Sequence, residues 1–264
     1  MGRYPETENF EIEADDGIVR ITIDSTSKHN SLNRTMSEEL LDVGAHLNAD
    51  DAARCVVLTG SGGVFCAGGD ISGFAADDNR SASTRRGASI FHDAVIAFHR
   101  AEVPLVVGVN GVAVGAGLSL AMMGDVVVIH EDAHLAYGYP GVGLPGDGGI
   151  TFHLPRLVGL RKAKEIALLG GEIDAEEAVE LHLATEVAGE NFDDRLAELA
   201  EEIGSGPTQA FGAAKRLLTD SLDNSIEEQL AAETDAIARG AGSADHEEGV
   251  RAFLEGREPE FEGR

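Results

Sequence analysis

VFCAGGDI, residues 64–71, is the stretch that decides the fold of this chain. A second glycine-rich stretch, NGVAVGAGLSL, occupies residues 110–120. Each follows a short apolar run typical of a buried strand, at residues 55–58 and 104–109, and each leads into a predicted helix start. Glycine lets the backbone turn sharply and approach a ligand closely, and the first N–H groups of a helix have no partner inside it. Two such loops side by side can direct two backbone donors at one oxygen atom, which is how enzymes bind an oxyanion.

The bulk composition indicates one large domain, or a domain with an appendage, that can build a real core. The chain has 264 residues, of which 43% are hydrophobic. No apolar run reaches the roughly 18 residues that a membrane span needs, and the polar, acidic start does not resemble a signal peptide. The two cysteines, Cys55 and Cys66, are too few for a disulfide framework or a cysteine-rich metal site. We therefore expect a cytoplasmic protein with free thiols that binds neither a membrane nor a metal.

The charge of the chain is strongly negative. With 47 acidic and 20 basic residues, the formal net charge is −27, which would repel the phosphates of a nucleic acid. Only four of the basic residues are lysines. Abundant carboxylates with scarce lysine favour a protein adapted to high salt, where the short Debye length screens self-repulsion. The alternative is an ordinary acidic cytosolic enzyme.

Periodicity and turn residues predict alternating strands and helices. The predicted strands are residues 10–12, 18–23, 55–59, 104–109, 126–129, 134–137 and 185–187. The predicted helices begin at Thr35 and cover residues 90–98, 118–123, 151–157 and 161–169, with only helices from residue 192 onward. Thr35 with Glu38 has the pattern of a capping box, and Asp174 and Ser225 are predicted caps of further helices. We expect a mobile loop or a frayed helix at residues 72–86, and a loop at residues 138–149.

Five motifs, in order along the chain, resemble those of the crotonase superfamily, the enoyl-CoA hydratase/isomerase family. Residues 28–32 (Lys-His-Asn-Ser-Leu) resemble the family's CoA-binding loop, and residues 65–71 and 110–117 resemble its two oxyanion loops. Residues 154–159 (Leu-Pro-Arg-Leu-Val-Gly) resemble the helix after its catalytic loop. Residues 250–255, with Pro259 and Phe261, resemble its C-terminal tail. The resemblance covers about residue 10 to the end of the chain.

The resemblance implies an α/β fold, a spiral of ββα turns over residues 1–200, followed by an all-helical trimerisation region over residues 201–264. It also implies a homotrimer or a dimer of trimers that acts on an acyl-CoA substrate. Coenzyme A is then part of the substrate, and no separate cofactor is expected. The backbone donors for the thioester oxygen fall on Gly69 and Ala116, the latter at a position where the family usually has glycine. The expected substrate-binding residues are Lys28, Asn30, Leu32, Ala67, Gly68, Asp70, Ile71, Gly115, Ser119, Tyr139, Lys215, Phe253 and Arg257.

Some of these residues have plain structural alternatives. Asp70 is expected to cap the following helix as well, and Ser119 to be a small residue in helix packing. Lys28, Lys215 and Arg257 could meet the phosphates of coenzyme A or be ordinary surface charges. Phe253 and Arg257 could cover coenzyme A across a subunit interface. His92, His99 and His153 are interpreted as helix residues rather than acids or ligands.

The sequence departs from the hydratases of the family at both catalytic glutamates, which fall on Ser119 and Tyr139. Hydration needs a base for water and an acid nearby, so a two-glutamate hydratase is disfavoured. One carboxylate remains, Asp147, in a stretch (residues 143–149) that resembles the Gly-Leu-x-x-Asp-x-Gly pattern of the superfamily's CoA isomerases, among them the ring-epoxide isomerase of phenylacetate breakdown and dienoyl-CoA isomerase. Our hypothesis is an enoyl-CoA isomerase in which Asp147 shuttles a proton. The alternative for Asp147 is a helix N-cap.

Other functions remain open at this stage. An enoyl-CoA hydratase of fatty-acid or phenylacetate breakdown with an atypical site is one, and a catalytically silent scaffold with the crotonase fold is another. Gly117–Ala121 is one residue away from the Gly-x-Ser-x-Gly elbow of serine hydrolases, but that interpretation leaves the first glycine loop unexplained. A dinucleotide fingerprint is disfavoured because its third glycine is missing.

Overall fold

The computed structural model describes residues 4–71 and 79–264. Its larger sheet has six strands in the order β1-β2-β3-β5-β7-β10. β1 runs antiparallel to β2, and the remaining neighbours are parallel. The bounds are Phe10–Asp15 (β1), Ile18–Ile23 (β2), Cys55–Gly60 (β3), Leu105–Val109 (β5), Val126–His130 (β7) and Glu186–Ala188 (β10). The central strands β3 and β5 are buried almost throughout, which explains their continuous apolar sequence.

A smaller sheet contains the strands that follow β3, β5 and β7 in the chain. Its order is β4-β6-β8-β9, with β9 antiparallel to β8. The bounds are Val64–Cys66 (β4), Val112–Val114 (β6), Leu135–Ala136 (β8) and Glu172–Ile173 (β9). Successive strand pairs therefore divide between the two sheets, and a helix follows each of the pairs β3-β4, β5-β6 and β7-β8. This arrangement confirms the α/β spiral of ββα turns.

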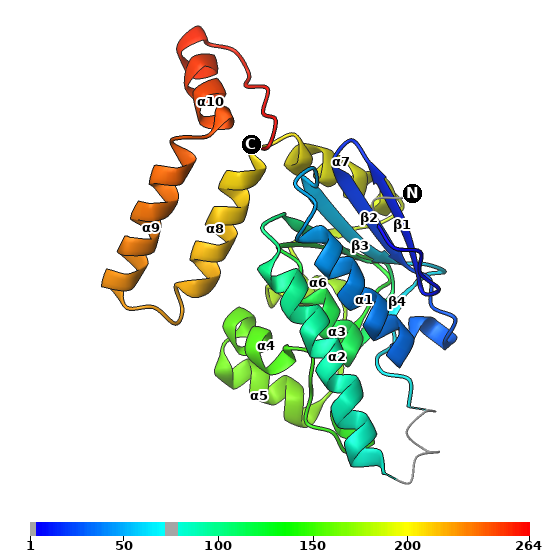
Figure 1. The fold of residues 1–264 in the computed structure, drawn as a ribbon. Coiled ribbons are helices and arrows are strands. Elements are labelled where there is room, and N and C mark those ends of the chain that lie inside the picture. The colour runs from blue at the N-terminus through cyan, green and yellow to red at the C-terminus, as the bar shows by residue number, and fades with distance from the viewer. Residues whose placement is uncertain (1–3, 72–78) are drawn as a thin grey trace.

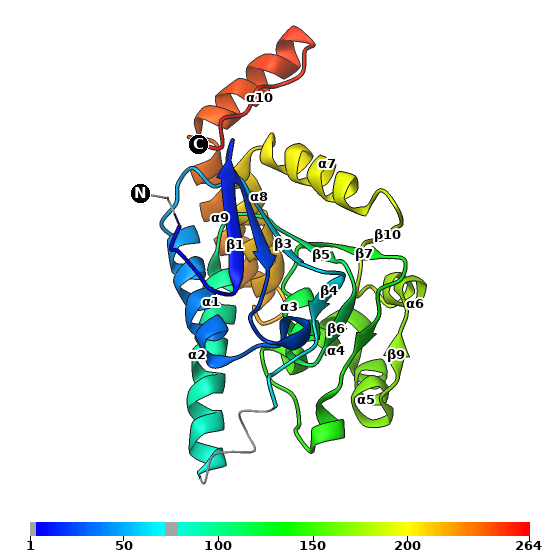
Figure 2. The same ribbon diagram turned by 90° about the vertical axis from the view of Figure 1, so that its right-hand side faces the viewer.

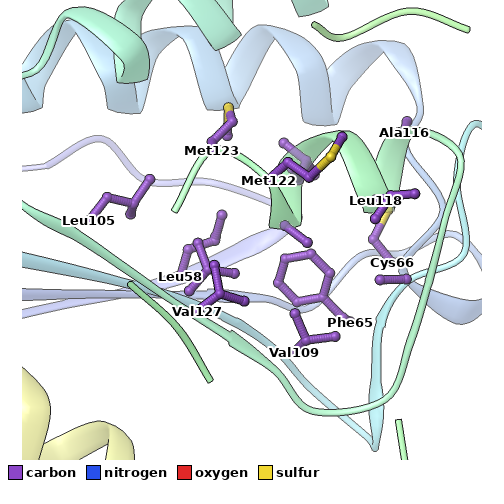
Figure 3. Packing of buried hydrophobic residues seen from close by; sticks show 14 of the residues in the cluster. Leu58, Phe65, Cys66, Leu105, Val109, Ala116, Leu118, Met122, Met123 and Val127 are labelled. Carbon is purple, nitrogen blue, oxygen red and sulfur yellow. The ribbon is translucent and has the colours of Figure 1, made fainter. Parts of the chain in front are cut away.

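Helices cover both faces of the larger sheet. Figure 2 shows α1 and α2 on one side of it and α7 on the other. The bounds are Arg34–Leu47 (α1), Arg80–Arg100 (α2), Ala116–Ala121 (α3), Ile150–Val158 (α4), Leu160–Leu169 (α5), Ala175–Glu180 (α6) and Phe192–Gly204 (α7), with short 3₁₀ helices at Lys28–Asn30 (η1) and Tyr139–Val142 (η3). The main core includes Phe65, which packs beside Val109, and Leu118, which lies near Cys66 (Figure 3). A second core lies beneath α7, around Leu196.

Three helices at the C-terminus form an arm that projects from this body (Figure 1), and the first of them contacts the body, for example through the ion pair of Lys215 with Asp125. They are Thr208–Asp220 (α8), Ile226–Gly240 (α9) and Ala244–Glu255 (α10). None of the side chains of α9 is buried. Large apolar side chains are exposed along the arm, among them Leu218, Leu222, Ile226, Leu230 and Ile237. Such a face needs a partner to leave water.

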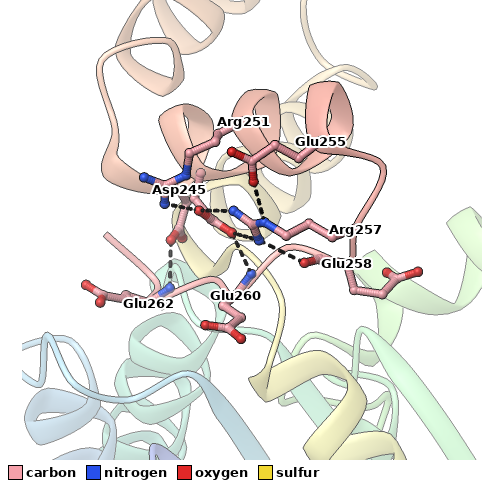
Figure 4. A network of polar contacts seen from close by, with 8 residues as sticks. Asp245, Arg251, Glu255, Arg257, Glu258, Glu260 and Glu262 are labelled. Atoms are coloured by element: carbon pink, nitrogen blue, oxygen red, sulfur yellow. Dashed lines mark hydrogen bonds and ion pairs between the residues drawn. The ribbon is translucent and has the colours of Figure 1, made fainter.

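The last residues of the chain fold back on α10 through a network of polar contacts (Figure 4). Asp245 accepts hydrogen bonds from the backbone N–H groups of Glu262 and Gly263 at 2.7 and 2.9 Å. Glu248 pairs with Arg251 and Arg257. These bonds hold the pKa of the Glu248 carboxyl well below its usual range, the Arg257 hydrogen bond contributing most.

Local signals predicted some helix starts and missed another. Asp174 accepts from the N–H of Glu177, and Ser225 forms the predicted capping box with Glu228. The capping box at Thr35 was wrong. The first long helix begins one residue earlier, and Asn33 caps it by accepting from the N–H of Met36 at 2.8 Å, since the amide oxygen of Asn33 reaches the third N–H of the helix.

Two expected irregular stretches are partly helical. The stretch 138–149 contains the short helix η3. Of the expected mobile loop or frayed helix at residues 72–86, residues 72–78 lie outside the described residues, and α2 begins at Arg80, before the predicted residue 90.

Candidate active site

The two glycine-rich loops touch at their backbones. β4 pairs with β6 in parallel, with Val64 opposite Val112 and Cys66 opposite Ala113. A Cβ atom at Gly117 would overlap the carbonyl oxygen of Cys66, and one at Gly68 would lie 2.8 Å from the carbonyl oxygen of Val114. Gly68 also has a φ of 98°, which favours glycine. Glycine at these two positions is therefore what allows the loops to lie side by side.

The N–H groups of the predicted donors, Gly69 and Ala116, have no partner in the part of the chain that the structure describes. Leu32 binds both neighbours of Gly69. The N–H of Leu32 donates to the carbonyl oxygen of Gly68 at 2.7 Å, and the carbonyl oxygen of Leu32 accepts from the N–H of Asp70 at 2.8 Å. Ala116 is the first residue of α3, after Gly115 with a φ of 58°. Within residues 4–71 and 79–264, neither the Gly69 nor the Ala116 N–H has a hydrogen-bond acceptor. Both are free to bind a ligand oxygen.

Both residues line one cavity of about 690 Å³. Its walls come from the loop before α1, the first glycine loop, the first half of α2, the second glycine loop and the stretch from η3 to Asp147. Among the lining residues are the predicted catalytic residues Gly69, Ala116 and Asp147. The lining residues that were predicted to bind substrate are Leu32, Ala67, Gly68, Asp70, Ile71, Gly115 and Tyr139. The fold therefore brings most of the predicted residues together. The size suits a small-molecule ligand.

The N-terminal half of α2 forms another wall. Ser83, Thr84 and Arg86 line the cavity, and they belong to the stretch 72–86, for which a mobile loop or a frayed helix was expected. Phe91 from the same helix and Leu144 from the opposite loop add apolar surface. The cavity thus combines an apolar wall with a few polar groups.

Asp147 lies on a loop whose shape depends on glycine. Gly146, Gly148 and Gly149 have φ values of 110°, 62° and 81°, a region that other residues rarely adopt. The N-cap of α4 is Gly149. The Asp147 carboxylate is bound elsewhere: its Oδ1 accepts a hydrogen bond from the hydroxyl of Tyr139 at 2.6 Å. The helix-cap alternative for the side chain of Asp147 is therefore wrong, because its carboxylate faces Tyr139 and the cavity.

Ser119 joins the same cluster. It is fully buried on α3, and its hydroxyl donates to the backbone oxygen of Asp147 at 2.9 Å. The hydroxyls of Ser119 and Tyr139 lie 3.3 Å apart. The two positions at which the resemblance places the glutamates of a hydratase thus both contact Asp147.

Tyr139 stays a neutral hydrogen-bond donor at neutral pH. Burial raises the pKa of its hydroxyl well above the ordinary value, and the charge of Asp147 and the hydrogen bond to it add to this effect. A neutral phenol facing a carboxylate gives a charge-assisted bond, which is short and strong.

His92, interpreted from the sequence as an ordinary helix residue, contacts the loop that carries Asp147. From α2, its Nε2 atom accepts the N–H of Gly148 at 3.1 Å and lies 3.9 Å from Oδ2 of Asp147. An Nε2 acceptor implies that the proton of the neutral ring is on Nδ1. No local pattern marks His92, because its position near Asp147 depends on the packing of α2 against a loop that is 56 residues away in the chain.

Besides Ser119, two predicted residues outside the C-terminal arm do not line the cavity. Lys28 is exposed on η1. Asn30 is buried, and its side chain bonds inward, accepting from Ser25 N at 3.1 Å and donating to Val64 O at 2.8 Å. Asn30 has a φ of 54°, so the loop turns its amide into the protein. Its contacts are structural.

The remaining predicted residues lie on the C-terminal arm. Lys215 forms an ion pair with Asp125 at 2.7 Å, and its side chain is only 15% exposed, so its charge is already engaged. Arg257 binds Glu248 and Glu255. Phe253 is 84% exposed on α10. These three residues are not among those that line the cavity of this chain.

The expected helix cap by Asp70 would involve residues 72–78, which lie outside the described part.

Other chemistries find little support in the described part of the chain. Burial raises the pKa of the Cys66 thiol to about 11 and that of Cys55 to about 12, so neither is a nucleophile at neutral pH. No cluster of three His, Cys, Asp or Glu side chains suited to a metal ion occurs among the described residues. The helices of that same part include none long and apolar enough to cross a membrane.

Comparison with known proteins gives consistent results. The family model described as "Enoyl-CoA hydratase/isomerase" matches residues 13–264. A Rhodobacter capsulatus protein named "Probable enoyl-CoA hydratase" is 36% identical over 96% of this chain and 97% of its own length. The 1,2-epoxyphenylacetyl-CoA isomerase of Escherichia coli is 34% identical over 94% of this chain and 96% of its own. A crystal structure of a Mycobacterium abscessus protein of the hydratase/isomerase type superposes with a TM-score of 0.91 at 33% identity, over 97% of this chain and all (100%) of that one.

Proposed function

The chain belongs to the enoyl-CoA hydratase/isomerase family, and from this premise we propose that it isomerises enoyl-CoA thioesters with Asp147 as the proton shuttle. The observation that carries the proposal is the placement of Asp147 in the cavity that the free N–H groups of Gly69 and Ala116 also line. An enolate needs both a base for the carbon acid and donors for the oxygen on which charge develops.

The proposed reaction begins with a 3-enoyl-CoA whose thioester oxygen accepts from Gly69 N and Ala116 N. Oδ2 of Asp147 takes a proton from C2, and the electron pair of that C–H bond moves into a dienolate whose charge rests on the thioester oxygen. The protonated Asp147 then gives the proton to C4. The double bond moves from C3–C4 to C2–C3, and Asp147 returns to its ionised form.

The residues at positions 119 and 139 support an isomerase over a two-glutamate hydratase. Ser119 and Tyr139 are polar but carry no carboxylate, and both are engaged with Asp147. Activation of water for addition at C3 needs a base of suitable pKa, which a buried Tyr139 with a raised pKa and a serine do not provide. Isomerisation needs one carboxylate, which Asp147 supplies.

The test is turnover of cis-3-hexenoyl-CoA by the wild-type protein and by Asp147→Asn, in high salt, with products identified by mass spectrometry. We expect Asp147→Asn to lower kcat by about 10²- to 10⁴-fold, the usual contribution of a general base. Asp70 is a second carboxylate in the cavity lining, so Asp70→Asn is the matched comparison. Full activity of Asp147→Asn together with loss of activity in Asp70→Asn would move the shuttle to Asp70.

Two further substrates separate this proposal from its neighbours. Hydration of crotonyl-CoA is the alternative suggested by the 36% identical relative named as a hydratase. Isomerisation of 1,2-epoxyphenylacetyl-CoA is the alternative suggested by the 34% identical isomerase, and the rings of Phe91 and Tyr139 in the cavity wall would suit an aromatic acyl group. Turnover of none of the three thioesters by a folded protein would favour a silent scaffold.

We also propose that the active protein is a homotrimer or a dimer of trimers. The exposed apolar side chains of the C-terminal arm support this, since a subunit interface would remove them from water. Light scattering after gel filtration in high salt tests it. A monomer at micromolar concentration would refute the assembly without touching the assignment of Asp147.

A further inference from the structure

The contacts around Asp147 differ between its two carboxylate oxygens. Oδ1 accepts the Tyr139 hydroxyl at 2.6 Å. Oδ2 has no hydrogen-bond donor within the described residues, and Nε2 of His92 lies 3.9 Å from it. The lone pairs of Oδ1 are therefore partly committed, while Oδ2 remains available as a base.

The peptide of Asp147 is held as well. Ser119 on α3 donates to its carbonyl oxygen at 2.9 Å, and His92 on α2 accepts the N–H of Gly148 at 3.1 Å. Tyr139 itself is 8% exposed, and its ring packs against that of Tyr137, with centroids 5.5 Å apart. The groups that hold Asp147 thus come from three separate elements, α2, α3 and η3, each fixed by the core.

We propose that Tyr139 is a positioning residue for the isomerisation: its hydroxyl binds Oδ1 of Asp147 and fixes the carboxylate so that Oδ2 alone transfers the proton between the two carbon atoms. Ser119 supports this arrangement by holding the backbone of Asp147. Tyr139 itself exchanges no proton with the substrate. The proposal rests on the proposed function, because it assigns a task to Tyr139 through Asp147.

The physical reason lies in the geometry of a shuttle. A single oxygen must reach C2 and then C4 without losing its proton to water. A carboxylate free to rotate about its last bond would spend part of its time with neither oxygen aligned, and a displacement of about 1 Å can cost about 10²-fold in rate. A short charge-assisted bond to one oxygen removes that rotation.

Tyr139→Phe is the direct test, since it removes the hydroxyl and keeps the ring. Tyr137→Phe is a matched control: the Tyr137 hydroxyl also donates at 2.6 Å to the same loop, but to the carbonyl oxygen of Pro145, and Tyr137 does not line the cavity. With cis-3-hexenoyl-CoA, we expect Tyr139→Phe to lower kcat by about 10- to 100-fold, with KM within about twofold of the wild type. Tyr137→Phe is expected to change kcat less than about threefold, the size of a small local effect.

The second readout is proton exchange in D₂O. A carboxylate held in place returns much of the abstracted proton to C4, whereas a loosened one exchanges it with solvent before the return. Tyr139→Phe is therefore expected to give product with more deuterium per turnover than the wild type or Tyr137→Phe. A merely structural role of Tyr139 would lower the amount of active protein without changing this ratio.

The outcomes separate the two proposals. Equal kcat and equal deuterium content in both tyrosine variants, with Asp147→Asn inactive, would overturn the role of Tyr139 and leave the proposed function intact. Absence of isomerisation in the wild type would overturn the proposed function. Crystal structures of the two tyrosine variants test the positioning role of Tyr139 directly. We expect the side-chain torsion of Asp147 to change in Tyr139→Phe only. A carboxylate of Asp147 that keeps its position in Tyr139→Phe would contradict this role.

Discussion

The backbones of Gly117 and Cys66 lie so close together that a Cβ atom at Gly117 would overlap the carbonyl oxygen of Cys66. This contact joins the start of α3, whose first residue is Ala116, to the end of β4, which precedes Gly69 in the chain. The relative position of the two free N–H groups therefore depends on a residue that has no side chain and takes no part in the chemistry.

Gly117→Ala should therefore destabilise the protein although alanine is the better helix former. Helix propensity alone would favour alanine by about 1 kcal/mol, whereas overpacking against a backbone atom costs about 1–3 kcal/mol or more. We expect a net loss of stability in urea unfolding at fixed salt. Gly240→Ala, at the end of α9 with no atom within 4 Å of a new Cβ, is the control. Equal or greater stability of Gly117→Ala would mean that the loops are not in contact.

His92 should influence turnover through Gly148. Gly148 is buried, and its N–H donates to His92 Nε2. Removal of the acceptor in His92→Ala leaves a buried N–H group without a partner, which costs about 1–3 kcal/mol, and loosens the residue next to Asp147. We expect a lower melting temperature and a kcat reduced by about tenfold, the equivalent of about 1.4 kcal/mol. Unchanged kinetics would show that the Asp147 loop holds its shape without His92.

His153 should make stability depend on pH below neutrality. Burial, with His99 and Arg156 nearby, lowers the pKa of His153 to about 4, from 6.5. The unfolded chain therefore takes up this proton near pH 6.5 and the folded protein only near pH 4, so the stabilisation is complete above about pH 6.5 and is lost as the pH falls towards 4. Allowing for partial solvation, the loss is on the order of 1–2 kcal/mol.

The measurement for His153 is the difference in unfolding free energy between the wild type and His153→Gln across pH 4–7. The many carboxylates titrate in both proteins, so the difference isolates the imidazole. We expect the wild type to lose stability faster than the variant as the pH decreases through this window. Parallel curves would contradict a half-buried, neutral His153.

Salt should stabilise the folded chain if its composition reflects adaptation to a saline environment. A net charge of −27 repels itself, and a Debye length of about 3 Å in molar salt screens that repulsion. We expect the melting temperature to rise from dilute to molar KCl, by about 2–4 °C for each kcal/mol of repulsion relieved. A melting temperature that stays the same over this range would remove the proposal of salt adaptation.

The sequence predicted features that depend on local or glycine-driven geometry. The two glycine loops, the strands β1 and β2 and the caps at Asp174 and Ser225 each depend on residues that are close in sequence or on a motif that resembles a known family. The short strands β4 and β6 inside the glycine-rich stretches were not predicted. The ion pair of Lys215 with Asp125, the inward turn of Asn30 and the contact of His92 with Gly148 were not predicted. They depend on tertiary packing or on a left-handed backbone, which no local pattern specifies.

Asp147 illustrates the boundary between the two cases. From the sequence, a carboxylate just before a helix and between glycines was equally compatible with a cap and a shuttle. The structure decides against the cap because Tyr139, eight residues earlier, binds the carboxylate, and because Gly149 occupies the cap position. The side chain of a residue can thus be assigned only when the folded loop shows what it faces.

The most direct test of the central claim is a crystal structure of the wild-type protein with hexanoyl-CoA, a saturated thioester that cannot isomerise. We expect a thioester oxygen about 2.7–3.1 Å from both Gly69 N and Ala116 N, with Oδ2 of Asp147 next to C2 of the acyl chain. A thioester oxygen bound to neither N–H group, or an acyl chain that lies away from Asp147, would contradict it.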